Sequence, residues 1–80
     1  MDVSEIKALI EAAIMNSTAE VQVDGSHVAV TVVSDAFEGL NAVKKQQLVY
    51  AGLQEPISSG AIHAVQIKTY TPSQWQELQA

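Results

Sequence analysis

The chain has 80 residues and no cysteine, which excludes disulfide bonds, thiolate nucleophiles and a metal site built from its own sulfur ligands. Nine acidic residues against four Lys and Arg give a net charge of −5 and a pI of about 4.6, which disfavours nucleic acid as a partner. A chain of this length with 48% hydrophobic residues predicts one packed domain over residues 1–80. Because no signal-like or membrane-spanning stretch is present, we expect a cytoplasmic protein without a membrane partner.

The first segment predicts an amphipathic helix. Apolar residues recur at steps of three and four from Val3 to Ile14, with charged residues between them. Asp2 or Ser4 could cap its N-terminus, and the polar residues 16–18 end the pattern.

Two strands joined by a tight turn are predicted next. Val21 and Val23 begin the first strand, which reaches Asp24-Gly25, a dipeptide suited to the positive φ of a hairpin. The second strand, over 26–33, is rich in β-branched residues and has two distinct faces. One face is formed by Val28, Val30 and Val32, and the other by His27, Ala29 and Thr31. We expect the valines to face the helices.

The remaining pattern predicts a middle helix, a second short helix, a third strand and a last helix. Helical spacing resumes at Val43 and continues to the breaks at Pro56 and Gly60. In the strand over 62–70, His63 shares the parity of Val65 and Ile67, which we expect to face the core.

The last helix has its own start signal. Thr71 is the expected N-cap, Pro72 the first helical residue and Gln74 the capping-box residue, while Trp75 is expected to pack in the core. The complete order predicts an α+β fold: a three-stranded mixed sheet with helices mainly on one face and a comparatively open second face.

Few residues could support chemistry. His27 and His63 are the only strong bases near neutral pH, and no serine lies in a Gly-flanked elbow, so we expect no enzyme. The glycines form no phosphate-binding loop. The two histidines with Asp24 or Asp35 could bind a metal weakly, or one neutral imidazole could join a metal centre that another molecule mostly supplies. The alternatives are a partly buried His63 bonded to a backbone carbonyl and a surface His27 beside the hairpin.

Four ordered blocks covering nearly the whole chain closely resemble the BolA family. They are Val-Ser-Asp-Ala-Phe-Glu-Gly-Leu at 33–40, Val-Lys-Lys-Gln-Gln-Leu-Val-Tyr at 43–50, Ile-His-Ala-Val at 62–65 and Thr-Tyr-Thr-Pro-Ser-Gln-Trp at 69–75. The Lys-Lys-Gln-Gln run is similar to the IbaG branch. The resemblance implies an α-β-β-α-α-β-α domain similar to class II KH domains. It also implies a non-enzymatic partner of monothiol glutaredoxins, in which a glutaredoxin cysteine, glutathione and the BolA-like protein together hold a bridging [2Fe-2S] cluster.

The resemblance also assigns roles to the histidines. His63 matches the histidine of the family's Ile-His-Ala block and is expected to ligate iron. The second family ligand comes from the loop between the first two strands, which is shortened here to 23–27 and leaves His27 as the one candidate. His27 aligns with the histidine that opens the second strand, so its role as an iron ligand is open.

These expectations support a cytoplasmic partner in iron–sulfur cluster trafficking or sensing and in the response to acid stress. The alternative is a nucleic-acid-binding transcriptional regulator that uses the KH-like fold with Lys44, Lys45 and Lys68. The chain has no GxxG clamp, and Lys45-Gln46 replaces the Arg-His of many BolA proteins. The oligomeric state of the free protein is also open, a weak homodimer included.

Overall fold

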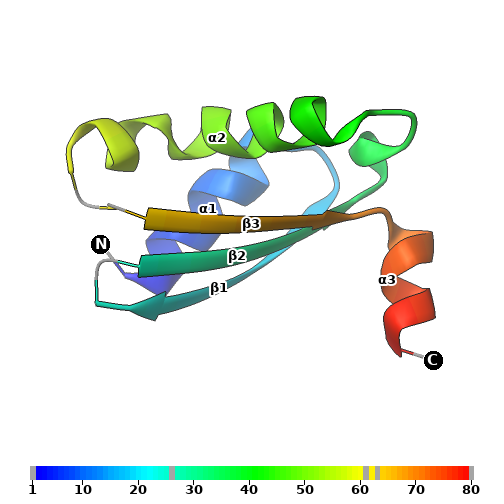
Figure 1. Ribbon diagram of the computed structural model, residues 1–80, viewed down its shortest axis with the longest axis horizontal. Helices are drawn as coiled ribbons and strands as arrows, with labels where there is room; N and C mark the ends of the chain where they lie inside the picture. Colours follow the sequence, from blue (N-terminus) through cyan, green and yellow to red (C-terminus); the bar gives the residue numbers. More distant parts are fainter. Residues whose placement is uncertain (1, 26, 61, 63, 80) are drawn as a thin grey trace.

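A computed structural model describes residues 2–25, 27–60, 62 and 64–79. The elements, in chain order, are α1 (Val3–Ala13), β1 (Ser17–Asp24), β2 (His27–Ser34), the 3-10 turn η1 (Asp35–Phe37), α2 (Ala42–Ser58), β3 (Ala64–Tyr70) and α3 (Pro72–Gln79). Figure 1 shows α1 and α2 on the same side of the sheet and α3 at its far end. No helix within the described ranges combines the length and the apolar character that crossing a bilayer requires.

The sheet has the strand order β1-β2-β3, with β1 antiparallel and β3 parallel to β2 (Figure 1). The parallel connection needs a crossover segment, which α2 supplies. This arrangement confirms the predicted fold class, a three-stranded mixed sheet with helices mainly on one face. The second face is covered at its far end, where Trp75 of α3 lies 5.5 Å from Tyr70, ring centre to ring centre. Trp75 is half-buried there and is not part of the core, so the prediction that it packs in the core is wrong.

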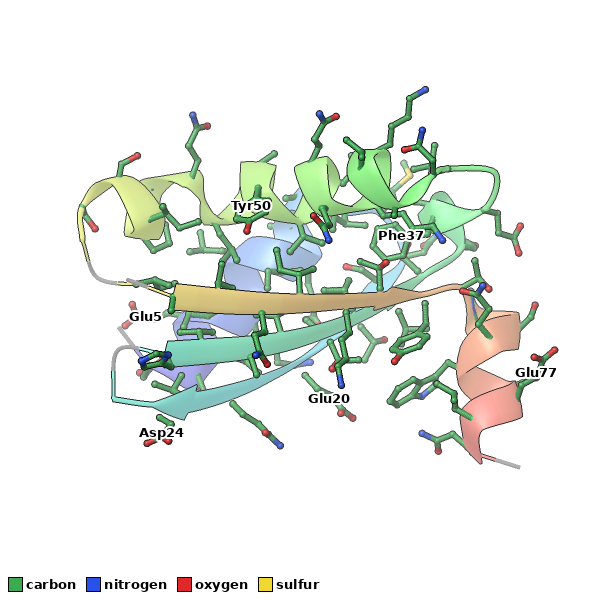
Figure 2. All side chains as sticks on the ribbon, viewed as in Figure 1. Glu5, Glu20, Asp24, Phe37, Tyr50 and Glu77 are labelled. Carbon is green, nitrogen blue, oxygen red and sulfur yellow. The ribbon has the colours of Figure 1, made fainter. Side chains whose placement is uncertain are left out.

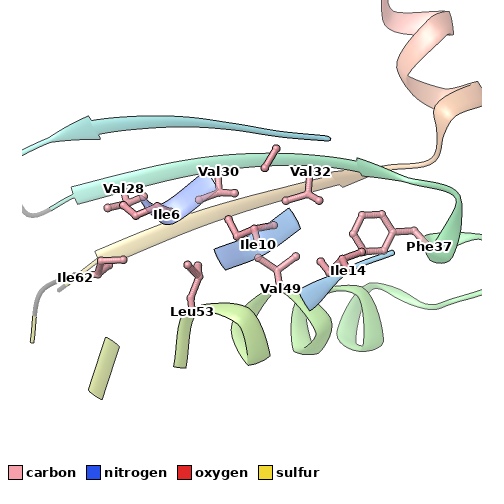
Figure 3. Close-up of a cluster of buried hydrophobic side chains, with 11 residues drawn as sticks. Ile6, Ile10, Ile14, Val28, Val30, Val32, Phe37, Val49, Leu53 and Ile62 are labelled. Atoms are coloured by element: carbon pink, nitrogen blue, oxygen red, sulfur yellow. The ribbon is translucent and has the colours of Figure 1, made fainter. Parts of the chain in front are cut away.

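The core lies between the sheet and the two long helices (Figure 3). Strand β2 alternates as predicted: its three even-numbered valines are buried, whereas His27 at its start is exposed. Phe37 of η1 is fully buried and closes one end of this layer. The other members of the core come mainly from the helices and include Ile6, Ile10, Ile14, Val49 and Leu53.

Side-chain caps fix the helix ends as the sequence predicts. The Glu5 amide donates to the Asp2 carboxylate at 2.9 Å, which identifies Asp2 as the cap of α1. At α3 the Thr71 amide donates to Gln74 Oε1 at 3.0 Å, and the Gln74 amide donates back to Thr71 Oγ1 at 3.3 Å. The predicted capping box is therefore confirmed.

The middle of the chain differs from the predicted order. Helix α2 runs without a break through Pro56 to Ser58, and the short turn lies before it, at η1. Pro56 removes one backbone donor only in the last turn, and its ring is buried, so packing outweighs the lost hydrogen bond. The prediction of a separate short helix after the middle helix is wrong. Strand β3 begins at Ala64, two residues later than predicted.

Helices α1 and α2 pack closely at Gly52. A Cβ atom placed on Gly52 would lie 3.0 Å from the Ala13 Cβ and 3.3 Å from the Leu9 carbonyl oxygen. The absence of a side chain at this position lets the two helices approach, which holds α2 over the sheet.

Candidate functional site

The candidate site is built on one cross-strand row at the hairpin end of the sheet. Asp24 of β1 is the register partner of His27 of β2, and His27 is the register partner of Ala64 of β3. Only Gly25 and Ser26 separate Asp24 from His27 in the sequence, and Gly25 has the positive φ of 62° that the turn signal predicts. Residues in one row of neighbouring strands lie about 5 Å apart, so the turn and the start of β3 form one corner.

This corner faces away from the helices. Val28, the next residue after His27, is buried under α1 and α2, so the opposite parity directs the exposed His27 to the open face. Figure 2 shows the labelled Asp24 and Glu20 of β1 pointing away from α2 in the same way.

A hollow of about 570 Å³ lies at this corner. It is bordered by the row just described and by the next row on the same face, in which Gln22, Ala29 and Gln66 are register partners. The full lining is Gln22, Val23, Asp24, His27, Val28, Ala29, Ala64, Val65 and Gln66. One imidazole, one carboxylate and two carboxamides therefore border a hollow whose other walls are apolar.

The predicted iron ligand His63 lies outside the residues that the structure describes. Its neighbour in sequence, Ala64, is the register partner of His27. The expectation for the rest of the strand is confirmed, because Val65 and Ile67 pack against the core. The ligand roles of His63 and His27 stay predictions.

The alternatives for a weak metal site are separated by the structure. Asp24 lies beside His27, whereas Asp35 follows the opposite end of β2 in η1. Within the described part of the chain, no three His, Asp or Glu side chains come together in a way that could hold a metal ion. A metal centre at this corner would therefore need ligands in addition to His27 and Asp24.

The lysines named for a nucleic-acid interface do not share one face. Lys68 has the parity of the exposed Gln66 on the open face, whereas Lys44 and Lys45 lie in the first turns of α2 on the opposite side of the sheet. Lys45 borders a separate hollow whose lining also includes the acidic Glu77. The structure does not bring these cations together.

Sequence reasoning did not single out Gln22 and Gln66 as residues of the site. Parity along β1 could have placed Gln22 beside Asp24 on the open face, because the hairpin turn fixes that register. Gln66 could not be placed in the same way, since the register of a parallel pair depends on packing through α2.

Comparison with known proteins identifies the family. The family model of BolA-like proteins matches residues 5–74. The chain is 44% identical over 75 residues to the acid stress protein IbaG of Escherichia coli (strain K12), covering 94% of this chain and 89% of that protein. The chain belongs to the BolA family. The resemblance in the sequence to this family and to its IbaG branch is thereby confirmed.

Solved structures of BolA proteins agree in fold. A BolA protein homologue from Coxiella burnetii superposes with a TM-score of 0.83 at 34% identity, covering 95% of this chain and 97% of that one. The BolA domain of SufE1 from Arabidopsis thaliana gives a TM-score of 0.75 at 31% identity, with coverages of 91% and 96%. The BolA fold is therefore shared over almost the full length of the described chain.

Proposed function

We propose that this BolA-family chain is a non-enzymatic partner of a monothiol glutaredoxin and that it supplies a histidine ligand to a [2Fe-2S] cluster bridging the two proteins. The observation that supports this proposal is the corner at which β2 and β3 begin. There His27 is exposed on the open face, in register with the residue that follows His63 in the sequence, beside a hollow of about 570 Å³.

The ligands that this chain can offer suit a cluster that it shares with another molecule. The chain contains no cysteine, so thiolate ligands must come from a second molecule. Imidazole nitrogen is an established substitute for thiolate in iron–sulfur proteins, and it raises the reduction potential of the cluster. Glutathione and a glutaredoxin cysteine would supply the sulfur ligands, and His63, with His27 as the second candidate, would supply nitrogen from this chain. The exposed position of His27 suits a ligand offered to a partner.

The two histidines have distinct assignments. His63 is the principal ligand, because it stands in the Ile-His-Ala block by which the chain resembles its family. His27 is the second candidate, because it is the one histidine in the short connection between the first two strands and lies exposed beside its register partner Ala64. The biological role that follows is iron–sulfur cluster trafficking or sensing, joined to the acid-stress response named for the relative from E. coli.

The proposal is tested by mixing the purified protein with a monothiol glutaredoxin that carries a [2Fe-2S] cluster and glutathione. Visible circular dichroism reports the asymmetry around the cluster. We expect the wild-type protein to change the spectrum of the loaded glutaredoxin. His63→Ala should lose most of this change. His27→Ala should lose only the part of the change that depends on the second histidine.

The matched control is Gln22→Ala, which changes the same hollow without removing a strong iron ligand. It should keep the wild-type spectrum. Identical spectra and affinities for the wild type and both histidine variants would refute histidine ligation. Failure of the wild-type protein to bind the loaded glutaredoxin at all would refute the partnership itself.

The separation of the lysines weighs against the alternative of a nucleic-acid-binding regulator, as does the net charge of −5. A salt titration of DNA binding distinguishes the two functions. Tight binding at physiological salt that is lost in Lys44→Ala, Lys45→Ala would favour the regulator.

A further inference from the structure

The outer edge of β1 faces no other strand of the sheet, and its backbone groups can be assigned from two hydrogen bonds. The Ala19 amide donates to Glu11 Oε2 at 3.1 Å, and Lys7 Nζ donates to the Ala19 carbonyl at 2.7 Å. Both backbone groups of Ala19 therefore point away from β2. Because this direction alternates along an antiparallel strand, the amide and carbonyl groups of Val21 and Val23 point outward as well.

The side chains of α1 close one part of this edge. Lys7 Nζ and Glu11 Oε2 are also 2.7 Å apart, so the ion pair and its two backbone contacts form one unit at Ala19. The hydrogen bond from Lys7, together with that from the Ala19 amide, lowers the pKa of the Glu11 carboxyl from its ordinary value, and burial opposes the shift. We call this unit the edge plug, because it occupies the backbone groups that an added strand would need at Ala19.

The edge beyond the plug, from Glu20 to Asp24, has no such cover. No hydrogen bond from outside the β1–β2 ladder reaches the backbone of Val21 or Val23 within the described residues. Val23 is 40% exposed, and the hairpin end of β1 lies at the same end of the molecule as the start of α1 (Figure 1). This open segment presents two outward amides and two outward carbonyls in a row.

The side chains of the open segment define what can pair with it. Glu20 and Asp24 point to the open face (Figure 2). The neutral Gln22 between them shares their parity, whereas Val21, which packs against the core, and Val23 have the opposite parity and point to the helix side. An added strand would therefore place basic residues opposite Glu20 and Asp24, four positions apart, and apolar residues opposite the two valines.

We infer that the outer edge of β1 from Glu20 to Asp24 binds an extended basic segment of another protein as a fourth strand, with the edge plug at Ala19 as its limit. Main-chain hydrogen bonds provide the pairing, and the alternating basic and apolar side chains provide the selectivity. A second copy of the chain fits poorly. Pairing β1 with itself about Gln22 places Glu20 opposite Asp24 of the other copy twice, and each copy has a net charge of −5.

The probe is the capped peptide acetyl-Ser-Lys-Val-Thr-Val-Lys-Ser-amide, titrated into the full-length ¹⁵N-labelled protein. We expect the amide signals of Val21 and Val23 to shift and their hydrogen exchange to slow. The inward amide of Gln22 and the occupied amide of Ala19 should keep their exchange rates. A control peptide with Glu in place of both Lys residues should not bind, and added salt should weaken the binding of the basic peptide.

Val23→Pro removes one outward donor without removing a hydrogen bond to β2. It should weaken peptide binding by about tenfold, the effect of one lost hydrogen bond at a strand edge. A peptide methylated on the backbone nitrogens that face β1 tests the same bonds on the unaltered protein. It should also bind weakly, so the test does not depend on the folding of the proline variant.

A separate variant tests whether the edge plug limits strand pairing at Ala19. In the variant Lys7→Ala, Glu11→Ala, a peptide extended past Glu20 should also slow exchange of the Ala19 amide. Unchanged exchange at Ala19 in that variant would overturn the plug as the limit of the edge. Shifts centred on α2 or equal binding by the methylated peptide would overturn the pairing. Concentration-dependent self-association that slows the same amides without peptide would overturn the choice of partner in favour of a second copy.

Discussion

Replacing Gly52 with alanine tests the packing that holds α2 over the sheet. The new Cβ would meet the Ala13 Cβ at 3.0 Å, whereas carbon atoms pack best at about 3.5–4.0 Å, so α1 and α2 must separate. Overpacking of this kind costs about 1–3 kcal/mol, while alanine gains about 0.5–1 kcal/mol over glycine in a helix. We expect Gly52→Ala to lower the free energy of unfolding by about 1 kcal/mol.

The assay is urea unfolding followed by far-ultraviolet circular dichroism, with thermal unfolding as a second measure. A loss of about 1 kcal/mol lowers the melting temperature of a domain of this size by about 4–8 °C. Ala51→Gly, at an exposed position of the same helix, is the matched control for helix propensity alone. Adding Ala13→Gly to Gly52→Ala removes the 3.0 Å contact and should recover most of the packing loss.

A gain in stability for Gly52→Ala would refute this reasoning, since it would show that the higher helix propensity of alanine outweighs the close contact with the Ala13 Cβ. Failure of Ala13→Gly to recover any packing loss would refute the assignment of the loss to that contact. The cycle of single and double variants therefore measures the coupling between the two helices.

Three further predictions concern the core, the edge plug and a helix cap. Phe37 is fully buried, so Phe37→Ala should lower the free energy of unfolding by about 3–5 kcal/mol and Phe37→Leu by much less. An unchanged melting temperature for Phe37→Ala would contradict its place in the core. The pKa of Glu11 is lowered on folding, so its stabilisation is present above pH 4.5 and is lost as the pH falls through the lower folded value. Glu11→Gln should therefore be less stable than wild type by about 1 kcal/mol at neutral pH, and a pH series of urea unfolding should show the gap closing in acid; a constant gap would argue against the titration. The Lys44 amide donates to Asn41 Oδ1 at 2.9 Å, so Asn41→Ala should cost about 1 kcal/mol in the same assay and Asn41→Ser little; equal losses would argue against the cap.

The parts of the fold that sequence reasoning predicts correctly depend on local contacts. Asp24-Gly25 fixes the turn, and the capping box of Thr71 and Gln74 fixes the start of α3, because the residues involved lie within four positions of one another. The alternation along β2 is equally local. The continuation of α2 through Pro56 could not be predicted locally, since it depends on the burial of that ring among distant residues.

The candidate site shows the same division. Parity places His27 on the open face, and the hairpin places Asp24 beside it, so this half of the corner follows from the sequence. The contribution of β3 does not, because the register of His27 with Ala64 depends on the path of α2 between them. The role of His63 comes from the family resemblance and is a matter for the spectroscopic experiment.

The register of His27 with Ala64 also determines which states of the chain a partner can recognise. The hairpin holding Asp24 and His27 closes over a short loop, whereas pairing with Ala64 requires closure through the whole of α2, which costs more chain entropy. If β3 separates from β2 by local unfolding, Asp24 and His27 stay paired in the hairpin, but Ala64 no longer lies beside His27 and β3 no longer borders the corner. A partner that contacts all three strands at this corner therefore binds only the completely folded chain.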